Sequence, residues 1–152
     1  MLTVYLDNCC YNRPFDDRRN IKNYLEREAV LLVMQKAFDG EFEIIGSDVV
    51  EREMAMISNP EKKEDVRGLY SAVTRGMVSL NDSIVQRAKD IMSQSNIKAF
   101  DSLHLAVAEA SADYLLTTDI KFAKACRNLE LGVVVKNPVD FVLEVNEYEY
   151  ND

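Results

Sequence analysis

Cysteine and histidine are scarce in this sequence, which contains three cysteines and a single histidine. Two of the cysteines, Cys9 and Cys10, are adjacent and the third, Cys126, has no partner left, so no disulfide framework is predicted. This use of cysteine indicates a reducing compartment and predicts a cytoplasmic protein. Without a Cys-x-x-Cys pair, the sequence also excludes the usual four-ligand structural zinc site.

Long apolar runs and basic residues are also few. No uncharged apolar stretch is long enough to span a bilayer, so we expect a protein without membrane contact. The first ten residues contain Asp7 and no basic stretch, which argues against a secretory signal or a transit peptide. Lysine and arginine total 18 against 26 aspartates and glutamates, a net charge of −8. A basic surface alone therefore cannot hold nucleic acid, and a phosphate substrate must meet a local basic patch or metal cations.

The residues that are present are those of an ordinary globular domain. Of the 152 residues, 47% are hydrophobic and 29% are charged, which is too apolar for a disordered chain. A domain of this length buries about 68–70% of the surface of its unfolded chain. We expect a single domain over residues 1–146, followed by an acidic tail, residues 147–152, that can fray.

Hydrophobic patterning predicts strands that alternate with helices. Short apolar runs bounded by turn residues predict strands at residues 2–6, 42–45, 77–80, 114–117 and 133–135. Helical spacing with caps and breakers predicts helices at residues 21–38, 48–58, 60–74, 81–92, 97–112 and 120–127, and a short one from 138. The segment up to Asn20, which carries Pro14, is expected to be a polar loop. This alternation predicts an α/β fold with a central parallel sheet covered by helices on both faces.

Two acidic residues follow strands of the predicted sheet. Asp7 comes directly after the first strand, and Asp119 follows the sequence Leu-Leu-Thr-Thr at the end of the fourth. Ligands of open parallel sheets bind beyond the carboxyl ends of the strands, where these two side chains would meet. Each has a structural alternative, because Asp119 can cap the helix that begins at Ile120 and Asp7 can be a turn residue.

Two further acidic candidates lie on predicted helices. Asp101 lies near the start of its helix, where it can also complement the helix dipole. Glu53 falls on the apolar face of the helix that begins near Asp48, whereas Glu51 points away and has capping-box spacing from Asp48. A glutamate directed at the protein interior is unusual unless it is paired or bound to a metal, so Glu53 is the better candidate.

Four converging carboxylates would repel one another, by on the order of 4 kcal/mol per pair at 4 Å in an effective dielectric near 20. Such a cluster needs a divalent cation. Carboxylate oxygens favour Mg²⁺ or Mn²⁺, which in turn bind phosphate and activate water. We therefore expect Asp7, Glu53, Asp101 and Asp119 to hold Mg²⁺ or Mn²⁺.

These acids, in this order and context, resemble those of the PIN-domain nucleases. Asp101 lies in Phe-Asp-Ser-Leu-His-Leu-Ala and Asp119 in Leu-Leu-Thr-Thr-Asp, after Asp7 at the first strand and Glu53 on a helix. From end to end the chain is similar to a stand-alone PIN domain of the VapC-like toxins. The resemblance implies a PIN-like three-layer fold and a metal-dependent endoribonuclease, with the four acids as catalytic residues and metal ligands. The implied products carry 5′-phosphate and 3′-hydroxyl ends.

Three nearby residues are candidates for contact with the substrate. Thr117 matches a small hydroxyl residue that the family often keeps near the metal. Asn8 stands where many members have Thr or Ser, and Arg13 begins a basic cluster in the segment that follows. We expect Asn8, Arg13 and Thr117 to contact RNA, although the interspersed aspartates make a merely solvated segment an equal alternative for the cluster.

Other residues and other functions compete with this interpretation. His104, one helical turn after Asp101, can orient that carboxylate or act as a general acid, but a lone histidine on a half-buried helix is more often structural. Cys9 and Cys10 are better explained as small buried residues than as nucleophiles. A haloacid dehalogenase would need Asp-x-Asp after the first strand. The main alternative is a catalytically silent PIN-like domain that binds RNA or a partner protein.

The resemblance also implies partners. In VapC-like pairs a small antitoxin would cover the site and place an arginine or lysine against the acids. Dimers are common among similar proteins. The expected partners are therefore an RNA substrate, a small antitoxin protein and a second copy of the chain.

Overall fold

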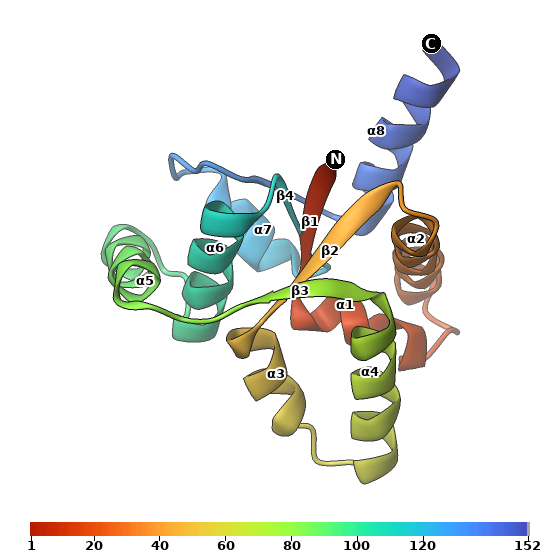
Figure 1. Ribbon diagram of the computed structural model, residues 1–152, viewed down its shortest axis with the longest axis horizontal. Coiled ribbons are helices and arrows are strands. Elements are labelled where there is room, and N and C mark those ends of the chain that lie inside the picture. Colours follow the sequence, from red (N-terminus) through yellow and green to blue (C-terminus); the bar gives the residue numbers. More distant parts are fainter. Residues whose placement is uncertain (152) are drawn as a thin grey trace.

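Five parallel strands form one sheet in the order β3-β2-β1-β4-β5 (Figure 1). The computed structural model describes the backbone of residues 1–151 and the side chains of residues 1–145. The strands are β1 (Leu2–Leu6), β2 (Phe42–Ser47), β3 (Thr74–Val78), β4 (Tyr114–Leu116) and β5 (Val134–Lys136). The predicted α/β class with a central parallel sheet is confirmed.

Helices connect the strands and cover the sheet. They are α1 (Asn8–Asn12), the 3-10 helix η1 (Arg13–Phe15), α2 (Ile21–Phe38), α3 (Asp48–Ala55), α4 (Pro60–Val73), α5 (Asp82–Gln94), α6 (Ala99–Ser111), α7 (Ile120–Cys126) and α8 (Pro138–Asn151). Helices α2 and α8 pack together on one side of the sheet, and α5 and α6 pack together on the other (Figure 1). In the described part of the chain, no helix is both long and apolar enough to cross a membrane.

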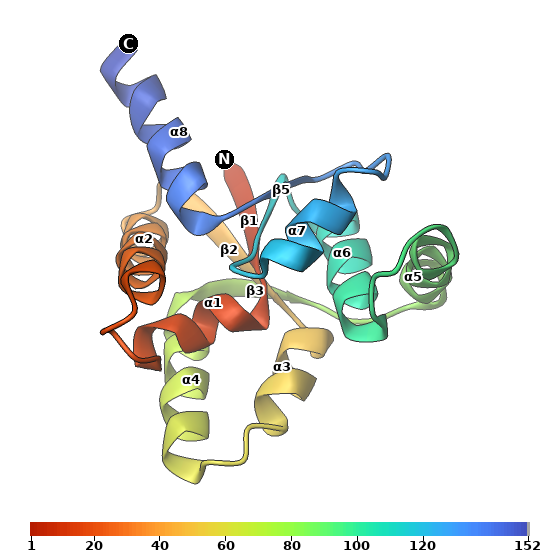
Figure 2. The ribbon, with the colours of Figure 1, turned by 180° about the vertical axis from the view of Figure 1, so that it is seen from behind.

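The strand order creates a crevice at one end of the sheet. The chain leaves β1 toward β2 and β3 on one side, and later returns to the other side of β1 for β4 and β5. At such a reversal the connections diverge beyond the carboxyl ends of the two central strands, which is where ligands of open α/β sheets bind. Figure 2 shows α1 and α3 at this end, away from the N-terminus. The residues that follow β1 and β4 therefore line the crevice.

Burial of the central strands and capping of the helices fix this arrangement. Val4, Tyr5, Leu6, Leu115 and Leu116 are fully buried, as expected for parallel strands covered on both faces. Most helices begin where a side chain accepts a hydrogen bond from a backbone N–H of the first turn. The capping residues are Asn20 for α2, Ser47 for α3, Asn59 for α4, Asn81 for α5 and Asp119 for α7.

The segment from Asp7 to Asn20 is the predicted polar loop only from Asp16 onward; its first part is helical. This part forms α1 and η1, and its residues Cys10 and Tyr11 are fully buried. A helix of five residues is too short to show an apolar period. Contact with the core, rather than local pattern, therefore explains why it forms.

Some other boundaries also differ from those predicted. Strand β3 begins at Thr74, whose hydroxyl donates to the Tyr70 carbonyl at 2.7 Å where α4 ends. Gly76 lies inside this strand, opposite Ile45 and next to an irregularity in the β2–β3 register, so it does not end the helix. Helix α8 is longer than expected and runs through Asn151. The predicted fraying of residues 147–152 lies outside the residues whose side chains are described.

Gly46 gives a test of the packing beside the cap of α3. A Cβ atom at this position would lie 2.1 Å from the hydroxyl oxygen of Tyr70. Tyr70 cannot easily retreat, because it is 7% exposed, donates to Glu51 Oε2 at 2.9 Å and packs edge-on against Tyr11. We predict that Gly46→Ala lowers the free energy of unfolding by about 1–3 kcal/mol, measured by urea denaturation.

The matched control is Gly68→Ala. Gly68 lies inside α4, and a Cβ atom there would meet nothing within 4 Å. This variant should gain roughly 0.5–1 kcal/mol, because alanine loses less conformational entropy in a helix. A Gly46→Ala protein as stable as the wild type would contradict the packing described here.

Candidate metal centre

Asp7 carries a carboxylate into the crevice at the end of β1. The residue is 5% exposed, and its backbone N–H donates to the Leu116 carbonyl of β4 at 3.0 Å. It stands at the N-cap position of α1, yet its side chain makes no capping hydrogen bond. Its Oδ2 instead accepts a hydrogen bond from the Thr117 hydroxyl at 2.8 Å. A turn or capping role therefore does not account for this buried carboxylate.

Thr117 connects Asp7 to Asp119. Its hydroxyl donates to Asp7 Oδ2 and accepts from the backbone N–H of Asp119 at 3.1 Å. Asp119 Oδ1 accepts from the Phe122 N–H at 3.1 Å and so caps α7, the structural role that the sequence suggested. Within the described residues, the other oxygen of Asp119 has no hydrogen bond. Capping of α7 thus occupies one carboxylate oxygen of Asp119 and leaves the other without a partner among the described residues.

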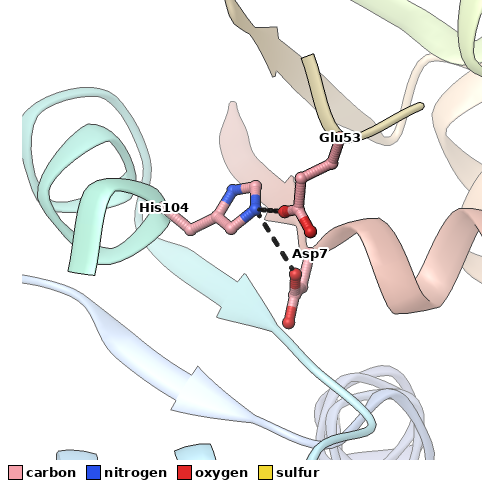
Figure 3. Close-up of side chains that lie close together, drawn as sticks. All are labelled: Asp7, Glu53 and His104. Carbon is pink, nitrogen blue, oxygen red and sulfur yellow. Dashed lines mark hydrogen bonds and ion pairs between the residues drawn. The ribbon is translucent and has the colours of Figure 1, made fainter. Parts of the chain in front are cut away.

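Glu53 approaches the crevice from α3. Its side chain is 24% exposed, and its Oε1 contacts Nε2 of His104 (Figure 3). Glu51 is exposed and accepts a hydrogen bond from the Tyr70 hydroxyl at 2.9 Å. The two glutamates therefore have the predicted orientations. Glu51 takes no part in a capping box, because the cap of α3 is Ser47.

The four predicted acids line a single pocket of about 330 Å³. Its lining residues are Asp7, Asn8, Cys9, Asn12, Asp16, Glu53, Asp101 and Asp119. None of these described lining residues is a lysine or an arginine. Asp16 is a further carboxylate in the pocket that the sequence did not single out, and it bonds to Arg13 at 2.9 Å and Lys62 at 3.3 Å.

The convergence of negative charge affects the protonation of Asp101. Burial, the largest cause, and the charge of Asp7 raise the pKa of Asp101 to about 6. Charged His104 opposes the shift, while Asp119 and Glu53 contribute to it more weakly. The contributions of Asp7, Asp119 and Glu53 to the raised pKa indicate a negative potential in the pocket, which is the potential that a cation would neutralise.

His104 lies among the acids, although the sequence favours a structural role for it. Its ring is buried, Nε2 lies 3.7 Å from Asp7 Oδ1 in addition to contacting Glu53, and Nδ1 is 2.6 Å from the Tyr5 hydroxyl (Figure 3). Burial lowers the pKa of His104, but the hydrogen bond to Glu53 and the nearby negative charges outweigh this and raise it overall. The one indication in the sequence was its position a helical turn after Asp101.

The candidates for substrate contact differ in their surroundings. Asn8 lines the pocket, and its Oδ1 is buried without a hydrogen-bond partner in the described chain. Arg13 is engaged by the protein itself. Its Nη1 donates to Asp16 and Asn23, and its Nη2 contacts Thr118 and Glu26, in each case at 2.9–3.1 Å. Contact of Arg13 with RNA stays a prediction, but its terminal N–H groups already have protein partners.

The donors in the pocket suit a hard divalent cation. Carboxylate oxygens predominate, and the ligand atoms of Asp7, Glu53 and His104 lie within 4.8 Å of one another. The Asn8 Oδ1 atom adds a neutral oxygen that lacks a partner among the described residues. Oxygen-rich sites of this kind favour Mg²⁺, Mn²⁺ or Ca²⁺ over metals that prefer nitrogen and sulfur. The residues present therefore fit a divalent cation.

A family comparison matches the PIN domain over residues 4–128. The chain belongs to the PIN domain family. The match extends from β1 to just beyond α7, so it includes all four acids of the pocket. The resemblance inferred from the sequence is thereby confirmed.

Solved structures share this PIN fold. VapBC2 from Rickettsia felis, in a structure bound to a DNA fragment from its promoter, is similar with a TM-score of 0.61 and 12% identity over 90% of this chain and 98% of that chain. FitAcB from Neisseria gonorrhoeae is similar with a TM-score of 0.56 and 18% identity over 89% and 97%. No curated protein sequence matches the chain. At these identities, the likeness concerns the fold.

The dual position of Asp119 gives a test that separates its cap from its charge. We predict that Asp119→Ala destabilises the metal-free PIN domain by about 1 kcal/mol, because it removes the cap of α7. Asp119→Asn should keep nearly full stability, since asparagine caps as well as aspartate. Urea unfolding in the presence of a chelator measures both. An equal loss in the two variants would show that the charge, and not the cap, stabilises this end of α7.

Proposed function

We propose that this PIN domain is a metal-dependent endoribonuclease that hydrolyses phosphodiester bonds of RNA. The pocket in which Asp7, Glu53, Asp101 and Asp119 meet is the observation that carries the proposal. These acids would be the catalytic and metal-binding residues, with Mg²⁺ or Mn²⁺ as the ion. When bound, such an ion polarises phosphate oxygens and lowers the pKa of water.

The hydrogen bonds of the acids support this role. In Asp7, Glu53 and Asp119, one carboxylate oxygen accepts a hydrogen bond from Thr117, His104 and the Phe122 N–H, respectively. The second oxygen of each accepts none from the described residues. One oxygen thus fixes the direction of the side chain, and the other is available to an ion.

A larger cleft beside the pocket offers an approach for RNA. It has a volume of about 750 Å³ and begins at Thr117, Thr118 and Asp119. Basic side chains along it are Lys22, Lys124, Arg127 and Lys136. Lys124 and Arg127 are exposed and form no ion pair with any described residue. They can therefore attract phosphates next to the acidic pocket, while Asn8 would contact the RNA at the pocket itself. Contact of Thr117 with RNA stays a prediction, but the residue is 1% exposed and its hydroxyl already bonds to Asp7 and to the Asp119 N–H.

We also infer a partner protein. The similar VapBC2 structure is that of a complex bound to promoter DNA, which supports assigning this chain to the toxin side of a toxin–antitoxin pair. Its partner would be a small antitoxin that covers the pocket. A homodimer and a cytoplasmic location belong to the same proposal.

Metal binding can be tested without any RNA. We predict that Mg²⁺ or Mn²⁺ raises the melting temperature, because an ion held only by the folded state at 100 times its Kd adds about 2.7 kcal/mol of stability. Differential scanning calorimetry measures the shift. The double variant Asp7→Asn with Asp119→Asn should lose it, and an unchanged response would place the ion elsewhere.

Cleavage tests the function itself. We predict that Glu53→Gln lowers Mn²⁺-dependent RNA cleavage at least about 100-fold, since loss of a ligand should exceed the roughly 10–100-fold effect of removing a ligand's hydrogen-bonded partner. Single-turnover cleavage of labelled RNA measures the rate. Glu51→Gln is the control on the same helix, and it should keep most activity because its amide oxygen can still accept from Tyr70.

The outcomes of this assay also separate the alternatives. Loss in Glu51→Gln with retention in Glu53→Gln would contradict the assignment of the site. A wild-type protein that binds RNA or a partner without cutting would instead support a catalytically silent PIN domain.

A further inference from the structure

We propose that His104 does not bind the metal ion but positions Glu53 by donating a hydrogen bond, and that Tyr5 and Ser47 fix the imidazole tautomer that this requires. The inference rests on the proposed function for the presence of a divalent ion. It assigns roles to three buried residues, on β1, β2 and α6, that the pocket's carboxylates do not explain. It also implies which class of metal the site accepts.

The proposal rests on a continuous series of hydrogen bonds that runs from the backbone of α3 to the side chain of Glu53. The Val50 N–H lies 3.1 Å from Ser47 Oγ, which lies 2.7 Å from the Tyr5 hydroxyl. The Tyr5 hydroxyl lies 2.6 Å from His104 Nδ1, and His104 Nε2 contacts Glu53. Ser47, Tyr5 and His104 are each 0% exposed, so water does not offer them other partners.

The direction of donation along this series of hydrogen bonds follows from the Val50 N–H at its start. A backbone N–H can only donate, so Ser47 Oγ accepts from Val50 and must place its own hydrogen elsewhere. Tyr5 is the remaining partner of that hydroxyl in the described chain. Ser47 therefore donates to Tyr5, and Tyr5 in turn donates to Nδ1 of His104. In the neutral ring the proton is then on Nε2, which donates to Glu53.

The opposite tautomer, with the proton on Nδ1, is unfavourable at both ends of this series of hydrogen bonds. If Nδ1 carried the proton, Tyr5 would accept it and donate to Ser47, whose buried hydrogen would have no acceptor. At the other end, the lone pair of Nε2 would face the carboxylate of Glu53. Buried polar groups without a partner are costly, so the chain strongly favours a proton on Nε2.

This tautomer decides whether His104 can be a metal ligand. The ligand atoms of Asp7, Glu53 and His104 are close enough together to form a site with one nitrogen and two carboxylates. With its proton on Nε2, however, His104 has no lone pair to give to an ion there. The site keeps oxygen ligands only, which favours Mg²⁺ or Mn²⁺ over Zn²⁺ or Ni²⁺, ions that readily accept imidazole.

The tautomer can be read directly, because the chain contains one histidine. Protein labelled with ¹⁵N in the imidazole ring gives a single set of ring signals in a long-range ¹H–¹⁵N spectrum. At a pH above the raised pKa of His104, where the ring is neutral, we expect the Nε2–H form in the metal-free protein and, unchanged, in the Mg²⁺-saturated protein. An Nδ1–H ring, or an Nε2 that loses its proton when Mg²⁺ is added, would overturn the proposal.

Metal selectivity provides the second readout. Tyr5→Phe removes the donor to Nδ1 but keeps the ring, so we expect the ratio of Zn²⁺ to Mn²⁺ affinity to rise about 10–100-fold, the range typical for changes to groups that orient a ligand. Added Zn²⁺ should then shift the ring of this variant to Nδ1–H. The matched control is Tyr11→Phe, because the Tyr11 hydroxyl is also buried but has no partner in the described chain. Its affinity ratio should equal that of the wild type.

These measurements separate this inference from the proposed function. An unchanged affinity ratio in a folded Tyr5→Phe protein, verified by circular dichroism, overturns the role of Tyr5 even if the wild type binds metal and cuts RNA. A wild type that binds neither ion contradicts the proposed function. In that case the spectrum of the metal-free protein still decides whether the hydrogen-bond chain has the inferred direction.

Discussion

The crowding of carboxylates at one end of the sheet is the constraint on which the site depends. The strand order brings the residues after β1 and β4 together, and α3 and α6 add Glu53 and Asp101 to the same pocket. Each close pair of charges would repel by on the order of 4 kcal/mol at 4 Å in an effective dielectric near 20. The structure holds the acids in place through neutral donors, such as Thr117 and backbone N–H groups, rather than through lysine or arginine. Neutral donors do not cancel the charge of the acids, so the negative potential remains and can attract a cation.

Two basic side chains near the pocket, Arg13 and Lys22, are held by a buried glutamate outside it. Glu26 is 2% exposed and forms ion pairs with Arg13 at 3.1 Å and Lys22 at 2.9 Å, and it also accepts from Asn137 at 2.7 Å. The same two cations reach the loop after β4, where Arg13 donates to the hydroxyl and Lys22 to the carbonyl of Thr118. Removing one partner of such a buried network leaves unpaired charge, which is strongly destabilising. This network therefore anchors the loop that carries Asp119. Of the described carboxylates that line the pocket, Arg13 pairs with Asp16, so the charges of the four predicted acids are not cancelled.

The sequence correctly predicts the elements whose bounds are set by local residue patterns. Strand β1 and helix α2 have the predicted bounds because apolar spacing and turn residues mark both of their ends. The acids that follow strands converge because parallel strands share a carboxyl edge. His104 could not be placed in the same way, since its partner Tyr5 is 99 positions away and Glu53 is 51 positions away. Helix α1 was missed for a related reason, because only tertiary burial distinguishes it from a loop.

The distribution of charge also links metal binding to RNA binding at the proposed active site. The chain has a net charge of −8, and the described lining of the acidic pocket includes no lysine or arginine. A phosphate that approached the pocket without an ion would meet mainly like charge there, even though Lys124 and Arg127 of the neighbouring cleft attract it. A divalent ion reverses the sign at the point where the scissile phosphate must lie. Under the proposed function, metal occupancy and productive RNA binding are therefore thermodynamically linked, and each increases the affinity for the other by the same factor.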